Sequence, residues 1–473
     1  MTRTELKDKH IAIIGLGVEG AALAQFAAAH GAASISITDM APAEKLKKYT
    51  DSLDHLAAPI QYYFAGNHSE VWLNKDILFV SPGITPGFAI SLPGINEAVQ
   101  SGAKVSNHTQ LFLEWCPAKV IGVTGSSGKT TTTTLLGAML QHGLDRKVYV
   151  GGNLGTSLLN EVDAMTADDV VVLELSEVQL ARLSISPHIG VITNITPDHL
   201  DRYGTFERYV EAKRQLVKYM DSGDYAILNA GNIPSQESAE YTAAKSLFFS
   251  AKYSETAQAY AHEDALWIHW DNEAPQQLCA FADITLPGAH NRENILAAAL
   301  AALLAGASIP ALRETIQSFD GVRHRLEFVK EWRGVKFYDD SIATSPQRAL
   351  AAVRAFSSPK LMILGGKNKD LPWEDFAEVI VRNVRAVALL GAAQPYIDSC
   401  IRAAQQRVIK EEQVLETICY VTTIEAAVSE LAAIARPGDT LLLSPGCTSH
   451  DMFHDYGERA EHFIEAVQHL PEN

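Results

Sequence analysis

Short apolar runs, many of them β-branched, alternate with longer amphipathic stretches along nearly the whole chain. Such runs bounded by turn residues predict strands, and their alternation with helical stretches predicts parallel sheets with helices on their faces. The alternation falls into three blocks, with breaks near residues 115 and 320. We therefore expect an α/β protein with three domains, over residues 1–115, 116–320 and 321–473.

The runs that predict strands are distributed over all three blocks. The first block contains HIAIIG, ISITD and ILFVSPGI. The second contains KVIGVT, VVVLELS, GVITNIT and YAILN, and the helical stretch LPGAHNRENILAAALAALLAG separates it from the third. The third contains VKFYDD, KLMILGG, AVALLG, TICYVTT and TLLLSPG.

Composition narrows the class of protein. The 473 residues carry a formal net charge of −17, with 47% hydrophobic and 20% charged residues, as in soluble proteins of several domains. A nucleic-acid-binding protein needs a basic stripe, so we expect no nucleic-acid partner. The five cysteines are scattered without a CxxC pair, and we see neither a signal peptide nor a membrane-spanning apolar run. These features predict a cytoplasmic protein with no membrane span.

The stretch TGSSGKT, between a predicted strand and a predicted helix, has the composition of a phosphate-binding loop. Gly125 and Gly128 allow a sharp turn that directs backbone N–H groups at phosphate oxygens. Lys129 supplies a cation for the terminal phosphates, and the hydroxyl of Thr130 is a ligand for Mg²⁺. The glycine spacing is one residue longer than in the strict motif, and the simpler interpretation is a glycine–serine turn that starts a helix.

A second glycine-rich turn, GLGVEG, follows the first predicted strand and contains Gly15, Gly17 and Gly20. Asp39 ends the next strand, which is typical of a dinucleotide-binding site and favours an NAD-dependent dehydrogenase. A helix N-terminus behind such a turn attracts any pyrophosphate, including that of a UDP-sugar. A tight turn that only packs the helix on the strand is the third interpretation.

Acidic residues and a histidine follow two strands of the middle block. Glu174 ends the strand in VVVLELS, where a buried carboxylate needs a partner, and it is placed to face the phosphate loop as an Mg²⁺ ligand. Asp198, His199 and Asp201 follow the strand in GVITNIT. A histidine there either satisfies local hydrogen bonds or binds a metal, and the sequence leaves both open.

Lys213 lies on an apolar helical stripe, where the helical period calls for a hydrophobic residue. The stripe in TFERYVEAKRQLVKYM is formed by Phe206, Tyr209, Val210, Leu216, Val217 and Met220. One interpretation is that the stem of Lys213 runs along the surface to water. The other is that the amine is buried, loses its proton readily and takes up CO₂ as a carbamate that binds a metal.

A series of motifs, in a fixed order, resembles those of the Mur ligases, the ATP-dependent amino-acid-adding enzymes of peptidoglycan precursor synthesis. The motifs are TGSSGKT, GGNLGT, ELSEVQL, TNITPDHLDRYG, EAKRQL, LPGAHNRENILAA, GVRHRLE, DDSIATSP, GGKNKD and LLLSPGCTSHDMF. They are most similar to the branch that adds glutamate to UDP-N-acetylmuramoyl-L-alanine. The resemblance implies an N-terminal Rossmann-like domain for UDP, a central P-loop ATPase-type domain, and a C-terminal Rossmann-like domain for the amino acid.

The resemblance also implies residues for ATP and magnesium. ATP would be held by the phosphate loop and by residues for the adenine, the terminal phosphate and the ribose: Thr124, Gly125, Gly128, Lys129, Thr130, Asn291, Asn294, Arg325 and Asp340. Two Mg²⁺ ions would be held by Thr130, Glu174, His199 and a carbamylated Lys213. The catalytic residues would be Lys129, Glu174, His199 and Lys213.

Residues for the other two substrates follow from the same resemblance. The UDP-linked substrate would contact Gly15, Gly17, Gly20, Asp39, Ser81, Asn153 and Ser176, and the glutamate would be held by Thr344, Lys369 and Ser449. ATP would convert the alanine carboxylate, a poor electrophile, into an acyl phosphate that the glutamate amine attacks. Cations would offset the repulsion between these anions, and domain closure would exclude water. We expect a monomer.

Three places depart from the pattern of the D-glutamate-adding branch. Ile342 stands in DDSIATSP where lysine is usual, and Glu177 stands in ELSEVQL where a second serine is usual. Met40 and Ala41 stand where Thr-Arg commonly helps to hold uracil. Because a lost cation is large enough to reshape specificity, D-glutamate is favoured and the L-glutamate-adding variant is the alternative.

Other classes of protein account for part of the sequence. A folylpolyglutamate synthetase would share the ATP site but has no use for the complete first block. An NAD-dependent oxidoreductase would explain GLGVEG and Asp39 but leaves Glu174 and Lys213 without a role. A nucleotide-binding regulatory or scaffold protein would keep the phosphate loops and would not need a lysine on an apolar stripe.

Overall fold

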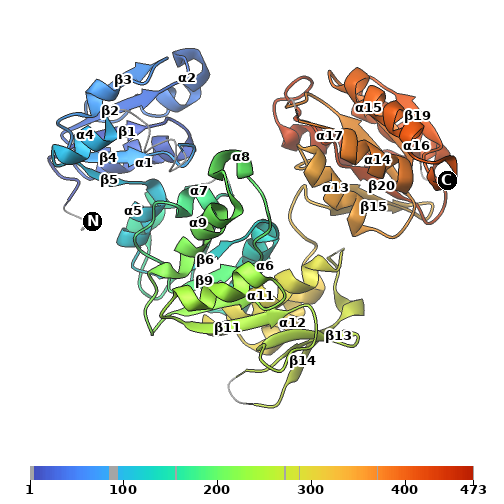
Figure 1. Ribbon diagram of the computed structural model, residues 1–473, viewed down its shortest axis with the longest axis horizontal. Helices are drawn as coiled ribbons and strands as arrows, with labels where there is room; N and C mark the ends of the chain where they lie inside the picture. The colour runs from blue at the N-terminus through green and yellow to red at the C-terminus, as the bar shows by residue number, and fades with distance from the viewer. Residues whose placement is uncertain are drawn as a thin grey trace. The chain divides into compact units, whose positions relative to one another are not determined.

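The computed structural model describes residues 5–84, 94–154, 157–270, 273–286, 288–369 and 371–471 (Figure 1). Its strands form three sheets, of five, nine and six strands, which confirms the predicted α/β architecture. The chain divides into two compact units, Met1–Asp283 with Arg292–Gln317 and Ile284–Asn291 with Ser318–Asn473. The first two sheets belong to the first unit and the third sheet to the second.

The first sheet is parallel and has the strand order β3-β2-β1-β4-β5. Along β1, Ile11 and Ile13 pack into one core, while Ala12 and Ile14 pack into a second core, as expected for a strand covered on both faces. The strand order reverses between β1 and β4, which places the usual ligand crevice at the carboxyl end of β1. The strands are β1 (His10–Ile14), β2 (Ser34–Asp39), β3 (Ile60–Phe64), β4 (Ile77–Val80) and β5 (Lys104–Ser106). The helices are α1 (Val18–Ala29), α2 (Ala43–Asp51), η1 (Ser69–Trp72), α4 (Ile95–Gln100) and α5 (His108–Trp115).

The second sheet has the order β14-β13-β12-β11-β10-β9-β6-β8-β7. Strand β6 lies between β9 and β8, with Val123 opposite Glu174 on β8. The carboxyl ends of β6 and β8, where the phosphate loop and Glu174 lie, are therefore neighbours. The strands are β6 (Lys119–Thr124), β7 (Val148–Gly152), β8 (Val170–Glu174), β9 (Ile189–Ile192), β10 (Tyr225–Asn229), β11 (Lys245–Ser250), β12 (Ala259–His262), β13 (Ala265–Ile268) and β14 (Gln276–Ala280).

The edge of this sheet differs from the sequence-based expectation. Strand β13 pairs antiparallel with both β12 and β14, whereas the other neighbouring strands pair in parallel. None of the four strands from β11 to β14 was predicted. Mixed sheets of this kind are common in large α/β domains. The helices are α6 (Lys129–Gly143), η2 (Leu159–Ala164), α7 (Glu177–Leu180), α8 (Leu200–Tyr203), α9 (Phe206–Lys218), α10 (Ile233–Gln236), η3 (Glu237–Tyr241), η4 (Phe281–Asp283), α11 (His290–Leu304) and α12 (Ile309–Ser318).

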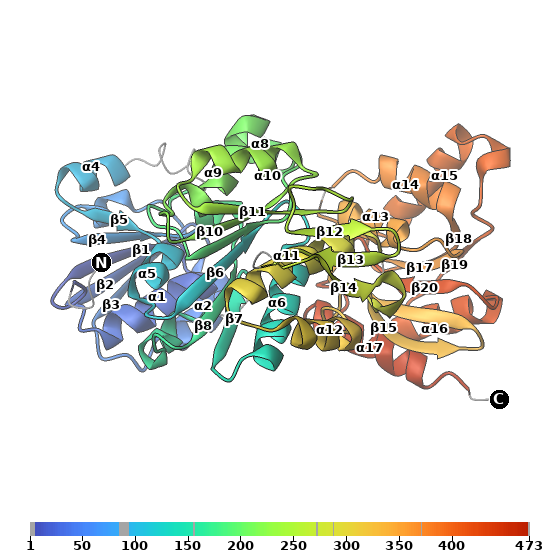
Figure 2. The same ribbon diagram turned by 90° about the horizontal axis from the view of Figure 1, so that it is seen from below.

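The third sheet has the order β15-β16-β20-β17-β18-β19 and is parallel except for β15. Helices α13 to α15 cover one face and α16 and α17 the other (Figure 2), and each face has its own apolar core. The strands are β15 (Glu327–Trp332), β16 (Val335–Asp339), β17 (Lys360–Gly365), β18 (Val384–Leu390), β19 (Thr417–Tyr420) and β20 (Thr440–Leu443). The helices are α13 (Pro346–Ala355), α14 (Glu374–Asn383), α15 (Gln394–Arg407), η5 (Lys410–Glu412), α16 (Ile424–Ile434) and α17 (Tyr456–Gln468).

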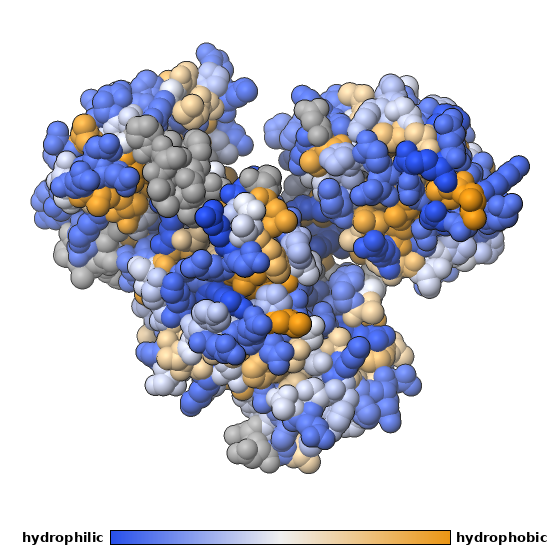
Figure 3. All heavy atoms as spheres, in the orientation of Figure 1, coloured by the Kyte–Doolittle hydropathy of each residue, from blue (hydrophilic) through white to orange (hydrophobic). Residues whose placement is uncertain are grey.

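Hydrophilic residues predominate on the face shown in Figure 3, and hydrophobic residues lie there in small separate groups. Among the described helices, none combines the length and the apolar character that crossing a bilayer requires. The buried apolar residues instead line the sheets.

Candidate active site

The phosphate loop joins β6 to α6, and its glycines are required by the backbone. Gly128 is the N-terminal cap of α6 with a φ of +81°, and a Cβ there would collide with Oδ1 of Asn294. Helix α6 begins at Lys129, with Thr130 in its first turn. The loop therefore presents the free N–H groups of a helix N-terminus, which is an arrangement that binds phosphate.

Residues that follow β9 hold this loop in place. The hydroxyl of Thr193 donates to the carbonyl of Ser127 at 2.7 Å, and Oδ1 of Asn194 accepts from the N–H of Ser127 at 3.1 Å. The carbonyl of Asn194 accepts from the N–H of Ser126 at 2.8 Å. On the other side of the loop, the hydroxyl of Thr124 donates to the carbonyl of Leu175 at 2.7 Å. Thr193 and Asn194 were not predicted as site residues, although polar residues directly after a buried strand are a usable signal.

Two lysine side chains converge on the carbonyl of Gly125. Nζ of Lys129 donates to it at 2.8 Å and Nζ of Lys213 at 2.9 Å. Lys213 is fully buried. Burial and the charge of Lys129 lower the pKa of Lys213 to about 7, against the opposing attraction of Glu177 and Asp198. The amine predicted on the apolar stripe therefore points inward, to the phosphate loop.

Glu177 connects Lys213 to His199. Its carboxylate is buried at the start of α7, with Oε2 at 3.7 Å from Nζ of Lys213 and Oε1 at 3.8 Å from Nε2 of His199. His199 has a φ of +51° at the cap of α8 and also lies 3.6 Å from a carboxylate oxygen of Asp198. Helices α7, α8 and α9 lie together in Figure 1. The side chain of Asp201 lies outside the described part of the chain.

Glu174, at the end of β8, has one carboxylate oxygen without a partner. Its Oε1 accepts a hydrogen bond from Nδ2 of Asn153 at 3.2 Å. Its Oε2 is buried, and no described residue donates to it. A buried carboxylate oxygen without a donor is unfavourable, and a bound cation satisfies it. The orphaned oxygen thus fits the predicted magnesium site beside the phosphate loop.

The predicted metal ligands do not form a closed cluster. In the described part of the chain, one group of histidine and carboxylate side chains has ligand atoms within 4.8 Å of one another, namely His324, Glu327 and Asp339. There, Nδ1 of His324 is hydrogen-bonded to Oδ2 of Asp339 at 2.8 Å. Glu174 and His199 lie outside that group.

The first glycine turn, between β1 and α1, also depends on glycine. Gly15 has a φ of +101°, and a Cβ there would lie 2.6 Å from Cβ of Ser81. A Cβ at Gly20 would collide with the carbonyl of Gly15. At Gly17, the cap of α1, a Cβ would meet no described atom within 4 Å. The turn is thus closely packed at Gly15 and Gly20 and open at Gly17, next to the helix N-terminus.

Asp39, at the end of β2, is engaged with the backbone of this turn. Its Oδ2 accepts from the N–H of Leu16 at 2.7 Å and its Oδ1 from the N–H of Ala41 at 2.8 Å. The adjacent side chain of Met40 is exposed. The carboxylate therefore holds the glycine turn in shape, which is a role the dinucleotide interpretation did not include.

A hydrogen-bonded chain links the first glycine turn to α7. The hydroxyl of Ser176 donates to Oε1 of Gln179 at 2.9 Å, and Nε2 of Gln179 donates to Oε1 of Glu19 at 2.6 Å. Glu19 belongs to GLGVEG, and burial raises its pKa. The predicted substrate residue Ser176 is therefore connected to the N-terminal turn through Gln179.

The remaining residues predicted for ATP are largely buried. Asn294 lies beside Gly128 in the first unit, whereas Asn291, Arg325 and Asp340 belong to the second. Asp340 follows β16, and burial raises its pKa to about 7 against the opposing hydrogen bond from Ser444 and the charge of Arg325. Near neutral pH, a carboxyl group with this pKa is present both protonated, as a hydrogen-bond donor, and ionised, as an acceptor.

The three residues predicted for glutamate all belong to the second unit. Nζ of Lys369 donates to the hydroxyl of Thr344 at 3.3 Å. At the position that lacks the usual lysine, the carbonyl of Ile342 accepts from the guanidinium of Arg348 at 3.4 Å. Burial and the charge of Arg348 lower the pKa of Lys369. A cation is therefore present at this loop, supplied by a residue that the sequence analysis did not identify.

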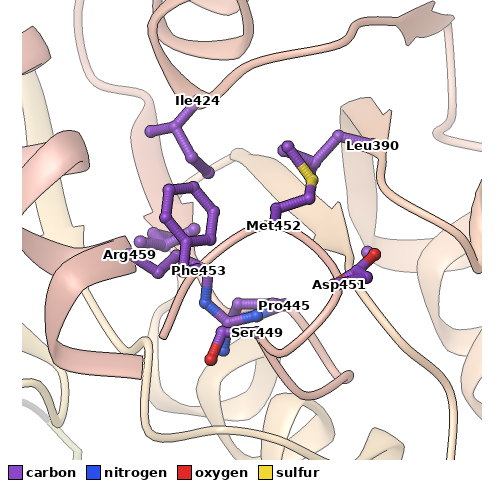
Figure 4. Close-up of a pocket in the computed structure, with 11 residues that line it drawn as sticks. Leu390, Ile424, Pro445, Ser449, Asp451, Met452, Phe453 and Arg459 are labelled. Atoms are coloured by element: carbon purple, nitrogen blue, oxygen red, sulfur yellow. The ribbon is translucent and has the colours of Figure 1, made fainter. Parts of the chain in front are cut away.

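Ser449 is buried in a small cavity at the carboxyl ends of β17, β18 and β20 (Figure 4). The cavity measures about 10 Å³, which is room for one water molecule and not for an amino acid. Arg459 also lines it and donates to the carbonyls of Cys447 at 3.1 Å and Ser341 at 2.8 Å. Arg459 thus joins the loops that carry Ser341 and Ser449, and the sequence analysis missed it.

Models of known domain families match most of the chain. These are the Mur ligase MurD-like N-terminal domain over residues 9–107, the Mur ligase middle domain over 123–302, and the Mur ligase glutamate ligase domain over 324–447. The UDP-N-acetylmuramoylalanine–D-glutamate ligase of Symbiobacterium thermophilum is 38% identical over 469 residues, which cover 97% of this chain and 98% of the relative. The ligase of the same name from Acetivibrio thermocellus is 35% identical over 468 residues, which cover 99% and 98%.

Solved structures share the fold at low sequence identity. The UDP-N-acetylmuramate-alanine ligase MurC of Thermotoga maritima aligns with a TM-score of 0.57 at 18% identity, covering 97% of this chain and 99% of that one. The MurF ligase of the same organism, in complex with ADP, aligns with a TM-score of 0.55 at 17% identity, covering 99% and 97%. Since three family models and full-length relatives above 30% identity agree, the chain belongs to the Mur ligase family.

Proposed function

We propose that this Mur ligase joins D-glutamate to UDP-N-acetylmuramoyl-L-alanine at the expense of ATP, forming ADP and phosphate in peptidoglycan precursor synthesis. The observation that carries the proposal is the convergence of Lys129 and Lys213 on the carbonyl of Gly125, beside the unpartnered oxygen of Glu174. The names of these relatives support the substrate and the D-isomer. The likeness to a MurF ligase solved with ADP supports the nucleotide.

The chemistry requires activation, because a carboxylate is a poor electrophile. Transfer of the terminal phosphoryl group of ATP to the alanine carboxylate gives an acyl phosphate, and the glutamate amine attacks its carbonyl carbon and expels phosphate. Lys129 brings positive charge to the loop where negative charge accumulates. The N-terminus of α6 adds the N–H groups that hold the phosphates.

Mg²⁺ would offset the charge of the phosphates when bound. The orphaned oxygen of Glu174 and the hydroxyl of Thr130, in the first turn of α6, suit one ion. We assign His199 and Lys213 to the second Mg²⁺ ion. The anionic oxygen that binds this ion would come either from a carbamate on Lys213 or from a neighbouring side chain. Oxygen and imidazole ligands of this kind suit the ion.

We assign substrate binding to the three blocks of the sequence. Residues 1–115 would bind the UDP-linked substrate at the turn with Gly15, Gly17 and Gly20, supported by Asp39 and Ser81 and, from the second block, by Asn153 and Ser176. Residues 116–320 would bind ATP, together with Arg325 and Asp340. Residues 321–473 would bind glutamate through Thr344, Lys369 and Ser449. The five unpaired cysteines suit a reducing cytoplasm, and we propose a monomer.

The proposal is tested by phosphate release from ATP in the presence of UDP-N-acetylmuramoyl-L-alanine and either D- or L-glutamate. We expect turnover that depends on both co-substrates and is faster with the D-isomer. Turnover with L-glutamate alone would identify the L-glutamate-adding variant, the alternative that the Ile342 departure suggests. With the muramoyl carboxylate labelled with ¹⁸O, one label should appear in the released phosphate, and its absence would exclude the acyl phosphate.

A further inference from the structure

The carboxylate of Glu177 is placed between the two groups that we assign to the second cation. One oxygen lies 3.7 Å from Nζ of Lys213 and the other 3.8 Å from Nε2 of His199. Glu177 is buried, and Lys213 is completely so. A buried carboxylate and two nitrogen groups thus share one small region behind the phosphate loop.

A carbamate on Lys213 would compete with Glu177 for this region. Carbamylation joins the amine to CO₂, so that Lys–NH₂ and CO₂ give Lys–NH–COO⁻ and a proton. The new carboxylate carbon would be bonded directly to Nζ, an atom with Gly125, Tyr209 and Glu177 as its close neighbours. Two carboxylates would then stand side by side in a buried site, where like charges strongly disfavour each other.

From this geometry we propose that Glu177 supplies the buried carboxylate between His199 and Lys213, and that Lys213 acts as an unmodified amine. The inference rests on the proposed function, since it names the ligand of the second cation in that same site. Glu177 provides the two oxygens that a carbamate would provide, and it does so without CO₂. Lys213 is a positioning residue whose amine holds the carbonyl of Gly125 and the carboxylate of Glu177 in place.

The chemical state of Lys213 is read directly by ¹³C NMR of the purified full-length protein in ¹³C-bicarbonate. We expect no protein carbamate resonance in the parent protein and the same spectrum for Lys213→Ala. A carbamate resonance of one equivalent in the parent that disappears in Lys213→Ala would overturn the inference. This readout needs no substrate and no turnover.

Cation binding gives a second test, with Mn²⁺ and ADP as the probes and free Mn²⁺ measured by electron paramagnetic resonance. Glu177→Ser should weaken the second Mn²⁺ by about tenfold or more in bicarbonate-free buffer. Adding bicarbonate should restore it in Glu177→Ser, with a carbamate resonance, and should not change the parent. Mn²⁺ binding by the parent that requires bicarbonate would contradict the inference.

Two further variants separate charge from folding. Glu177→Gln keeps the shape of the side chain and removes its charge, so it should weaken the binding of the second Mn²⁺ in the same way. It replaces Glu177→Ser in the test if that variant does not fold. Glu211→Ser removes an exposed carboxylate from helix α9 and should bind Mn²⁺ as the parent does. If phosphate release fails while the Mn²⁺ and NMR results hold, the proposed function is wrong and the assignment of Glu177 stands.

Discussion

Nδ2 of Asn153 donates to Oε1 of Glu174 at 3.2 Å, while Oε2 of the same carboxylate is buried without a described partner. Asn153 follows β7 and Glu174 ends β8, and the two strands are paired. The amide belongs to the residues assigned to the UDP-linked substrate and the carboxylate to those assigned to Mg²⁺. The reacting end of the substrate and the cation are thus assigned to one pair of strand ends.

Replacing Glu174 should remove the thermal stabilisation of the protein by Mg²⁺ and leave the fold intact. In Glu174→Gln we expect the protein to fold, because the substitution removes a buried charge with an unsatisfied oxygen. The thermal stabilisation that Mg²⁺ adds in the presence of ADP should be lost, and phosphate release should fall by about a hundredfold or more. Thermal melts with and without Mg²⁺ measure the first effect. Glu161→Gln, an exposed change on η2, is the control, and a normal Mg²⁺ response in Glu174→Gln would refute the assignment.

The close approach of Asn294 makes Gly128 irreplaceable. Gly128→Ala should lose about 1–2 kcal/mol of stability from the positive φ alone, and a further loss should come from the collision with Oδ1 of Asn294. Gly204→Ala isolates the first effect, because Gly204 has a φ of +75° and its nearest atom, on Arg208, lies 4.0 Å away. Urea unfolding measures both variants. Equal losses of stability in the two variants would mean that the side chain of Asn294 moves aside without a measurable cost.

Asp340 should make stability depend on pH. Its pKa is about 7 in the fold against an ordinary value of 3.8, so the folded protein keeps a proton that the unfolded chain has released between these values. The carboxyl group therefore contributes stability at pH 4 that is lost as the pH rises through 7. Asp340→Asn does not titrate, so its stability relative to the parent should rise over this interval, on the order of 1–4 kcal/mol. Unfolding by urea at pH 4, 5.5, 7 and 8 measures the difference, and a difference that is constant with pH would show that Asp340 titrates normally.

Arg348 should compensate for the lysine that is absent at Ile342. Its guanidinium lies 3.4 Å from the carbonyl of Ile342, and its positive charge helps to lower the pKa of Lys369. In Arg348→Ala we expect the KM for glutamate to rise roughly tenfold or more, the scale of one charge-assisted hydrogen bond, with the KM for ATP unchanged. Arg354→Ala, near the other end of α13, is the matched control. An unchanged KM for glutamate in Arg348→Ala would mean that residues other than Arg348 bind the carboxylate of the substrate.

Much of the fold was predictable because its strands are buried on both faces. Runs such as HIAIIG and VVVLELS became β1 and β8 as expected. Strands β12 to β14 were missed because they are edge strands of four or five residues, joined by local antiparallel pairs such as Ala261 with Leu266, and runs this short are too brief for an alternating pattern to show. The order of the strands is likewise set by packing between segments and leaves no signal in any one run.

At the candidate site, individual residues could be predicted from the sequence, but the contacts between them could not. The apolar stripe correctly marked Lys213 as an inward-facing amine. Glu177 was visible only as a departure from a motif, because its approach to His199 depends on how the short helices α7 and α8 pack against α9. Arg459 was missed because a buried arginine that binds backbone carbonyls leaves no periodic signal.

The hydrogen bond from Gln179 to Glu19 has a consequence for the order in which ligands bind. Helix α7 is four residues long, with Glu177 at its start and Gln179 two residues later. A pyrophosphate bound at the N-terminal turn would bring negative charge next to Glu19, and we expect this to change its hydrogen bond with the amide of Gln179. We expect this change to be felt at Glu177, so that loading of the sugar nucleotide alters the affinity of the cation site, and by linkage the reverse.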